Sequence, residues 1–200
     1  MPPGIHPDDE VRAWLSRRLV EDEVWLAEVA GAPVGYARFT RTWLDDLYVL
    51  PAYAGQGVGS ALLDVVKAQR RDGFCLWVFE MNAPARAFYA HHGLVELERT
   101  DGSANEERVP DVRMAWPGED PLTFLRGLID EVDEQLGDLL ARRAALTAAV
   151  QDIKHDTTRD LDRERAIAQT MALKAPALGV ERLDRIVHTI ITKSLDAAGS

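Results

Sequence analysis

Hydrophobic and polar positions follow two different patterns along the chain. Up to about residue 116, short apolar runs alternate with amphipathic segments, which predicts strands separated by helices. Beyond residue 121, apolar side chains recur at steps of three and four residues, which predicts helices alone. The expected strands are 24–29, 33–40, 44–50, 74–80 and 112–116, and the expected helices are 8–19, 55–71, 84–92, 122–154, 159–175 and 180–197.

These elements predict an α/β domain around a mixed sheet, followed by an all-α domain of three helices. The segment 117–121 holds two prolines, a glycine and two acids, a composition typical of a linker. We therefore expect domains at 1–117 and 122–200, joined by 118–121. The first helix of the second domain spans about 33 residues, or roughly 50 Å. A helix of this length usually needs a partner along its whole length.

Composition supports two domains and excludes several classes of protein. Thirteen of the 14 aromatic residues precede Pro117. The net charge of −10 disfavours binding to nucleic-acid phosphates. The N-terminus does not resemble a signal peptide, no run is apolar enough for a membrane span, and the five histidines lack metal-ligand spacing. The single cysteine, Cys75, excludes an internal disulfide and fits a reducing compartment, so we expect a cytoplasmic protein without a metal.

A glycine-rich turn follows the third predicted strand and leads into a helix. Glycines let the backbone approach a phosphate, and the helix N-terminus adds the positive end of its dipole. The spacing fits neither the dinucleotide fingerprint nor the Walker loop. By itself, the turn is as compatible with a simple chain reversal as with a phosphate site. Its residues are Gly55, Gln56, Gly57, Val58, Gly59 and Ser60.

A second motif follows the next predicted strand, and it reads Asn82-x-x-Ala85-x-x-Phe88-Tyr89-x-x-x-Gly93-Leu94. Together with the glycine turn it resembles the GNAT superfamily of acyl-CoA N-acyltransferases, over roughly residues 24–116. The resemblance implies that the turn holds the pyrophosphate of acetyl-CoA and that the helix after Asn82 packs along the pantetheine arm. The implied cofactor-binding residues are Val49, Gly55, Gln56, Gly57, Val58, Gly59, Ser60, Asn82 and Tyr89.

The same resemblance implies that Tyr89 protonates the departing CoA thiolate, which a phenol can do if its proton reaches the sulfur. Alternatively, Tyr89 packs in the core beside Phe88. The chain departs from the family pattern at Ala54, where Arg or Gln is usual, and in lacking the family's first strand and one helix before Val24. The acceptor is not specified. The candidates for a general base are Glu80, Asp45 and Asp46.

Charged residues within the predicted helices form the second candidate site. On the long helix, Arg143 and Lys154 are 11 residues apart and lie within about 20° of one face. Arg126 precedes Arg143 by 17 residues and lies about 100° around the helix, so it faces elsewhere.

The next helix begins with charges that repel at i,i+4 spacing. Arg159 is paired with Arg163, and Asp160 with Glu164. An anionic ligand between the arginines would relieve the repulsion. The alternative is a surface on which these groups form ordinary ion pairs.

The charged positions resemble, in register, the all-helical chorismate mutase family over about residues 121–194. That family is an interlocked dimer in which each long helix crosses into the other subunit's site. The resemblance therefore implies a homodimer through the C-terminal helices, with Arg126 serving the partner's site, and no cofactor for this half. The matching residues are Arg126, Arg143, Lys154, Arg159, Asp160, Arg163, Glu164 and Ser194.

The chemistry of that family explains these residue types. Conversion of chorismate to prephenate is unimolecular, so the enzyme only holds a small dianion in its reactive conformer and stabilises charge on the breaking ether oxygen. Carboxylates are well matched by guanidinium forks. The resemblance implies that these come from Arg126 of the partner subunit, from Arg143 and from either Arg159 or Arg163, with Ser194 assisting.

The resemblance also implies that Lys154 donates to the ether oxygen, and that Asp160 and Glu164 hold the ring hydroxyl. The family places Gln or Glu one turn after the serine, where this chain has Ala198. Loss of one such donor typically costs ~10²–10³ in rate. A weak mutase, or one completed by an activating partner enzyme, is therefore an alternative.

Other functions fit the same helices. Isochorismate pyruvate-lyase shares the fold, and Asp160 with Glu164 would also suit a mutase for an amino-substituted chorismate. A non-enzymatic alternative makes the helical domain a ligand sensor and dimerisation module for the acetyltransferase. Conversely, the GNAT-like half would serve only to bind CoA or to regulate the mutase.

Overall fold

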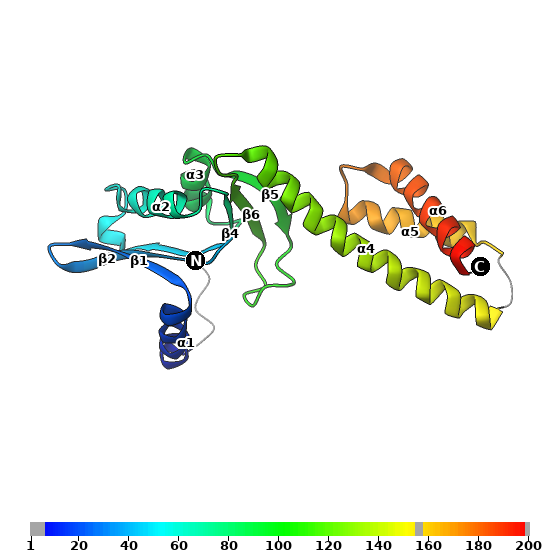
Figure 1. Ribbon diagram of the computed structural model, residues 1–200, viewed down its shortest axis with the longest axis horizontal. Helices are drawn as coiled ribbons and strands as arrows, with labels where there is room; N and C mark the ends of the chain where they lie inside the picture. The colour runs from blue at the N-terminus through cyan, green and yellow to red at the C-terminus, as the bar shows by residue number, and fades with distance from the viewer. Residues whose placement is uncertain (1–6, 155–157, 199–200) are drawn as a thin grey trace. The chain divides into compact units, whose positions relative to one another are not determined.

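The computed structural model describes residues 7–154 and 158–198. Its contacts divide the chain into two units, residues 1–127 and 128–200, and each is described by itself (Figure 1). Of the histidines considered for a metal site, His6 and His155 lie outside the described residues.

The first unit has the order of elements expected of an α/β domain, with ends that differ from the expected ones by a few residues at most. Its elements are α1 (Asp8–Glu21), β1 (Glu23–Val29), β2 (Ala32–Phe39), β3 (Leu44–Val49), η1 (Pro51–Tyr53), α2 (Val58–Gln69), β4 (Phe74–Phe79), α3 (Ala83–His91), β5 (Val95–Thr100) and β6 (Asp111–Trp116).

The strands form two antiparallel sheets of three, in the orders β1-β2-β3 and β4-β6-β5. One parallel bridge, between Trp43 and Cys75, joins them, and the Cys75 N–H donates to the Thr42 carbonyl at 2.9 Å. The expected α/β domain is confirmed, and the parallel pairing that a mixed sheet requires is limited to this bridge among the described residues. Beyond this bridge, β3 and β4 each form an edge of their sheet, and the backbone groups on these edges pair with no other strand of the described residues. These edges lead into the glycine turn and into Asn82.

β5 is the strand that the hydrophobic pattern does not predict. Five of its six residues are exposed, so it has no buried apolar face. It pairs with β6 at the edge of the sheet. Arg99 also bridges Glu80 and Glu96 across this edge, each at 2.6 Å. Backbone pairing and ion pairs therefore hold a strand that hydrophobic periodicity cannot detect.

The core of the first unit lies between α2, α3 and the two sheets. Leu62, Leu63 and Val66 of α2 are buried against strand residues that include Phe39 and Phe74. Burying an aliphatic or aromatic side chain of this size stabilises the fold by about 1.5–3 kcal/mol. The core thus fixes the start of α2, where the glycine turn lies.

Residues expected to form a linker pack on the first unit. The Glu119 N–H donates to the Arg71 carbonyl at 2.9 Å. A Cβ atom on Gly73, which has a φ of +103°, would lie 2.5 Å from the Phe124 ring. Contacts assign residues up to Gly127 to this unit. The expected limits at 117 and 122 stay a prediction.

The second unit is built from helices. They are α4 (Pro121–Lys154), which enters the unit at Leu128, α5 (Leu161–Lys174) and α6 (Gly179–Ala198). α4 has 34 residues, one more than the 33 that its periodicity predicts. α5 and α6 pack together through Ala168, Leu183 and Val187. By contrast, α4 buries none of its residues, and most of its leucines are exposed, with Leu146 at 69%.

Candidate functional sites

The glycine turn lies at the N-terminal end of α2. Gly55 and Gly57 have φ angles of 75° and 86°, in the left-handed region that favours glycine. Gly57 is the N-cap of α2, and no described side chain caps it. The first N–H groups of a helix have no helical acceptor. Those of Val58, Gly59 and Ser60 therefore suit an anion, and the helix dipole adds to the attraction.

Ser60 also connects α2 to α3. Its Oγ lies 3.0 Å from Nε2 of His92, and Lys67 donates to the His92 carbonyl at 2.6 Å. Burial, followed by the electrostatic effects of Lys67 and His91, lowers the pKa of His92, which favours its neutral imidazole. This contact fastens the end of α3 to the glycine turn. No local sequence signal marks His92, because Ser60 is 32 residues away.

Asn82 and Tyr89 occupy the start and the buried face of α3. The Asn82 side chain accepts the Ala85 N–H at 3.3 Å, as an N-cap does. Tyr89 is 9% exposed and packs edge-on against Phe88, with ring centroids 5.3 Å apart. Burial, and then the charge of Asp46, raises the pKa of Tyr89 to about 12. The phenol therefore keeps its proton at neutral pH and is also part of the core.

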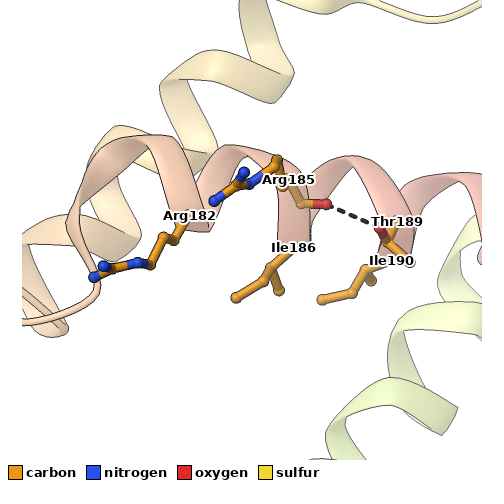
Figure 2. A pocket seen from close by; sticks show the side chains of 5 residues that line it. All are labelled: Arg182, Arg185, Ile186, Thr189 and Ile190. Carbon is orange, nitrogen blue, oxygen red and sulfur yellow. Dashed lines mark hydrogen bonds between the residues drawn. The ribbon is translucent and has the colours of Figure 1, made fainter.

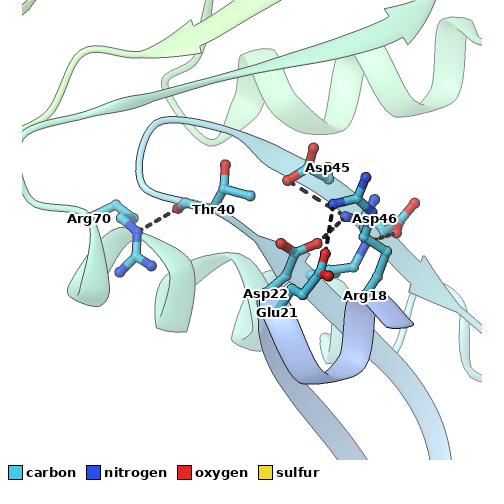
Figure 3. Close-up of polar contacts among 8 residues, drawn as sticks. Arg18, Glu21, Asp22, Thr40, Asp45, Asp46 and Arg70 are labelled. Atoms are coloured by element: carbon cyan, nitrogen blue, oxygen red, sulfur yellow. Dashed lines mark hydrogen bonds and ion pairs between the residues drawn. The ribbon is translucent and has the colours of Figure 1, made fainter. Parts of the chain in front are cut away.

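Asp46 belongs to a charge cluster around Arg38 of β2, which is buried. Figure 3 labels the aspartates of this cluster, Asp22, Asp45 and Asp46. Arg38 donates through Nε to Asp46 at 2.5 Å and through Nη1 to Asp22 at 2.6 Å. The Asp45 carboxylate lies 4.0 Å from the same guanidinium. The Trp14 ring of α1 covers this guanidinium, with 4.8 Å between the Arg38 Cζ atom and the ring centroid. Burial raises the pKa of Asp45, although Arg38 opposes that shift. Three carboxylates therefore share one buried cation.

The three carboxylates considered as general bases differ in whether they belong to this cluster. Glu80 is not in it, since its carboxylate accepts from Arg99 at 2.6 Å on an exposed edge. Burial raises the pKa of Asp45, which is the direction that favours a general base. Asp46 is held in the cluster, and its charge lies close enough to Tyr89 to raise the pKa of Tyr89. Asp45 and Asp46 therefore remain as candidates beside Tyr89.

In the second unit, two predicted site residues meet between α4 and α6. Arg143 donates through Nη1 to Oγ of Ser194 at 2.9 Å, across 51 residues of sequence. Ser194 is buried and donates to the Ile190 carbonyl at 2.7 Å. Lys154, the last residue of α4, is exposed, and Arg126 is exposed nearer its start. This hydrogen bond thus links α4 to α6.

Arg159 makes a second cluster, on a different side of α6. Its Nε and Nη2 grip the Glu164 carboxylate at 2.7 and 2.6 Å. Its Nη1 donates to Thr192 at 2.9 Å, and Nη2 lies 3.1 Å from Nδ1 of His188. The bond from Arg159 lowers the pKa of Glu164, against a smaller effect of burial. Thr192 and His188 have no motif in the sequence that would mark them.

The expected repulsion between Arg159 and Arg163 within one helix does not occur. Asp160 is the N-cap of α5 and accepts the Arg163 N–H at 3.0 Å, so Arg159 precedes the helix and turns back to Glu164. Arg163 stays exposed on the surface of α5. It lines a shallow hollow of about 270 Å³ together with Ala166, Ile167, Thr170 and Met171.

A larger open hollow lies along one face of α6, where Ile186 and Ile190 point the same way (Figure 2). Its volume is about 460 Å³, and no residue that lines it is a predicted site residue. It is therefore distinct from the anion site expected from the sequence. Its lining residues are Arg182, Arg185, Ile186, Thr189 and Ile190.

Two further searches cover the described part of the chain. Within residues 7–154 and 158–198, no three His, Cys, Asp or Glu side chains are grouped closely enough to hold a metal ion. No helix in these ranges is long and apolar enough to cross a membrane.

Comparison with known proteins identifies both parts of the chain. Residues 21–96 match the acetyltransferase (GNAT) domain model, and residues 125–198 match the type II chorismate mutase model. Both resemblances drawn from the sequence are confirmed. A similar protein is an uncharacterized N-acetyltransferase of Archaeoglobus fulgidus, 32% identical over an alignment of 108 residues, with a coverage of 46% of this chain and 72% of that protein.

A second uncharacterized N-acetyltransferase, from Methanocaldococcus jannaschii, is 31% identical over an alignment of 104 residues, with a coverage of 44% of this chain and 46% of that protein. Among solved structures, a GCN5-related N-acetyltransferase from Rhodopseudomonas palustris has a TM-score of 0.48 and 27% identity, over 54% of this chain and 69% of that one. A putative streptothricin acetyltransferase from Bacillus anthracis, in complex with acetyl coenzyme A, has a TM-score of 0.45 and 17% identity, over 49% and 63%.

The cluster around Arg38 gives a stability prediction. Arg38→Met leaves the three aspartates without their buried cation, which is expected to lower the free energy of unfolding by about 3–5 kcal/mol at pH 7. Arg71→Met is the control, because Arg71 meets Glu119 at 3.7 Å on the surface, where a pair contributes about 0–1 kcal/mol. Urea unfolding measures both.

The pH dependence separates this effect from lost packing. Burial raises the pKa of Asp45, so acidification removes its negative charge, which relieves repulsion in Arg38→Met and removes its attraction to Arg38 in the wild-type chain. The difference in stability between the two proteins should therefore shrink as pH falls from 7 to 4. A difference that stays constant with pH would contradict the role assigned to the cluster.

Proposed function

Since the chain belongs to the GNAT N-acetyltransferase family and carries a type II chorismate mutase domain, we propose that its helical unit converts chorismate to prephenate. The observation that carries this proposal is the contact between Arg143 and Ser194. It holds a guanidinium and a hydroxyl together where α4 meets α6, as binding of a carboxylate requires. The α/β unit adds a second activity, transfer of an acetyl group from acetyl-CoA to an acceptor that is not identified.

A homodimer through α4 is part of the proposal. Its support is a 34-residue helix that buries none of its residues and exposes a row of large apolar side chains. Helices of globular proteins owe most of their stability to packing of such a face. Arg126 precedes Arg143 by 17 residues, about 25 Å along the helix, so we assign Arg126 to the site of the other subunit.

The remaining site residues have roles that their positions support to different degrees. Lys154 lies on the face of α4 that carries Arg143 and is assigned to the ether oxygen. Glu164 is buried with its carboxylate held by Arg159, and it is assigned to the ring hydroxyl. Asp160 already accepts a backbone N–H, so its share in that contact is smaller. Ala198 supplies no donor, and an activating partner enzyme stays part of the proposal.

In the α/β unit, acetyl-CoA fits the uncapped start of α2, because the glycine turn there leaves N–H groups without a side-chain acceptor. Acetyl-CoA supplies the acetyl group. The turn would bind its pyrophosphate, Tyr89 would give a proton to the thiolate, and Asp45 would accept one from the acceptor amine. A cytoplasmic location is proposed because Cys75 is the single cysteine of the sequence, so the chain forms no internal disulfide, as is usual in a reducing compartment.

Arg143→Ala tests the mutase site. It is expected to reduce chorismate turnover by ~10²–10³, because a carboxylate of the substrate loses its guanidinium. Circular dichroism and gel filtration should show an unchanged fold and assembly. Arg142→Ala is the matched control, since Arg142 is exposed on the same helix turn. Equal losses in both variants, or retained turnover in Arg143→Ala, would contradict the site.

Mixing chains tests whether the site is shared between subunits. After unfolding and refolding together, equal amounts of Arg126→Ala and Arg143→Ala chains form about half hybrid dimers, each with one intact site. About a quarter of wild-type activity should return. Activity no greater than that of either variant alone would rule out the shared site.

Gly57→Glu tests the cofactor site. Acetyl-CoA at about 100 times its Kd should stabilise the wild-type chain by about 2.7 kcal/mol and raise its melting temperature. Gly57→Glu places a like charge at the phosphate site and should abolish this shift. Gly31→Glu is the control, because Gly31 has a similar φ of +77° in open space, in another turn. A shift that persists in Gly57→Glu would place the cofactor elsewhere.

A further inference from the structure

We infer that Arg159 is a positioning residue of the mutase site and not one of the arginines that bind the substrate's carboxylates. Held by Thr192 and His188 of α6, it fixes the carboxylate of Glu164 for the ring hydroxyl. The inference rests on the mutase function proposed above. It decides between Arg159 and Arg163, which the sequence leaves open, and it adds two residues to the site.

The hydrogen bonds of Arg159 leave little for a substrate. A guanidinium has five N–H donors and no acceptor. Two of them grip Glu164, one goes to Thr192 and one to His188. A fork to a substrate carboxylate needs two parallel N–H groups, so Arg159 would have to release Glu164 to form one. Arg163, which is exposed, has no such restriction.

The two contacts on α6 form a row of acceptors. Thr192 and His188 are one helical turn apart and therefore share a face. The Thr192 hydroxyl donates its own hydrogen to the His188 carbonyl at 2.8 Å, so it accepts from Arg159. His188 can accept through Nδ1 only with its hydrogen on Nε2. Together they hold the guanidinium on α6 while it grips α5.

This arrangement sets the state of Glu164. The charged and titratable groups that face Glu164 are Arg159, Asp160 and His188, and the bond from Arg159 has the largest effect, which lowers the pKa of Glu164. At 8% exposure, the carboxylate is shielded from water. An ionised carboxylate only accepts hydrogen bonds, which suits a hydroxyl donor on the substrate.

A double-mutant cycle separates positioning from direct binding. If Arg159 acts through Glu164, Arg159→Ala and Glu164→Gln should each reduce kcat/KM about ten- to hundredfold, and the double variant should be no worse than the poorer single one. The losses in kcat/KM caused by Arg163→Ala and by Glu164→Gln should instead multiply in their double variant. Multiplying losses for Arg159→Ala and Glu164→Gln would overturn the inference.

The pH profile tests the contact on α6. Thr192→Val loosens Arg159, so the pKa of Glu164 should rise and the acid limb of kcat/KM should move to higher pH. Thr189→Val is the matched control, because Thr189 also donates to the carbonyl four residues before it but is not in contact with Arg159. A purely structural loss would lower activity without moving the limb, which would contradict the inference.

One measurement does not depend on turnover. Carbon-13 NMR of the glutamate carboxyl groups, with Glu164 assigned by Glu164→Gln, follows the titration of Glu164 in the full-length chain. Its pKa should rise in Thr192→Val and stay unchanged in Thr189→Val. An unchanged titration in Thr192→Val would overturn the inference, whereas a wild-type chain without chorismate turnover would overturn the proposed function alone.

Discussion

The exposed apolar surface of α4 is the constraint on which the helical unit depends. A 34-residue helix that buries none of its residues lacks the packing that stabilises most helices in water. A second copy of the chain would cover this surface. The same helix carries Arg143 to Ser194 and keeps Arg126 about 25 Å away. Covering the apolar face and completing the anion site are therefore one event in the proposed dimer.

Arginines fix carboxylates in both units, and in each pair at least one partner is buried, Arg38 in the first unit and Glu164 in the second. Arg38 holds Asp22 and Asp46 on one face of the first sheet, and Arg159 holds Glu164 against α6. Burial of such a pair is costly unless its hydrogen bonds are satisfied. Each arginine meets this condition through several donors. These carboxylates are thus kept in fixed positions. Two groups are less restrained, namely Asp45, which is proposed as the general base, and Arg163, which is left to bind a carboxylate of the substrate.

Much of the fold could be predicted because hydrophobic periodicity reports burial. It predicts α4 and all the strands except β5, whose residues are exposed at a sheet edge. The candidate residues could be named from charge and glycine patterns, yet their partners could not. Contacts of Arg159 with Thr192, and of Ser60 with His92, join segments about 30 residues apart. Such contacts follow from helix packing, which no local pattern encodes.

The most direct test of the central claim is the loss of chorismate absorbance with the purified full-length chain, with prephenate identified as the product. The proposed site predicts turnover at an enzymatic rate, without added protein or with an activating partner, because Arg143, Ser194 and Glu164 are already in place. No turnover under either condition, while chorismate still raises the melting temperature, would contradict it. The helical unit would then be a sensor of the dianion.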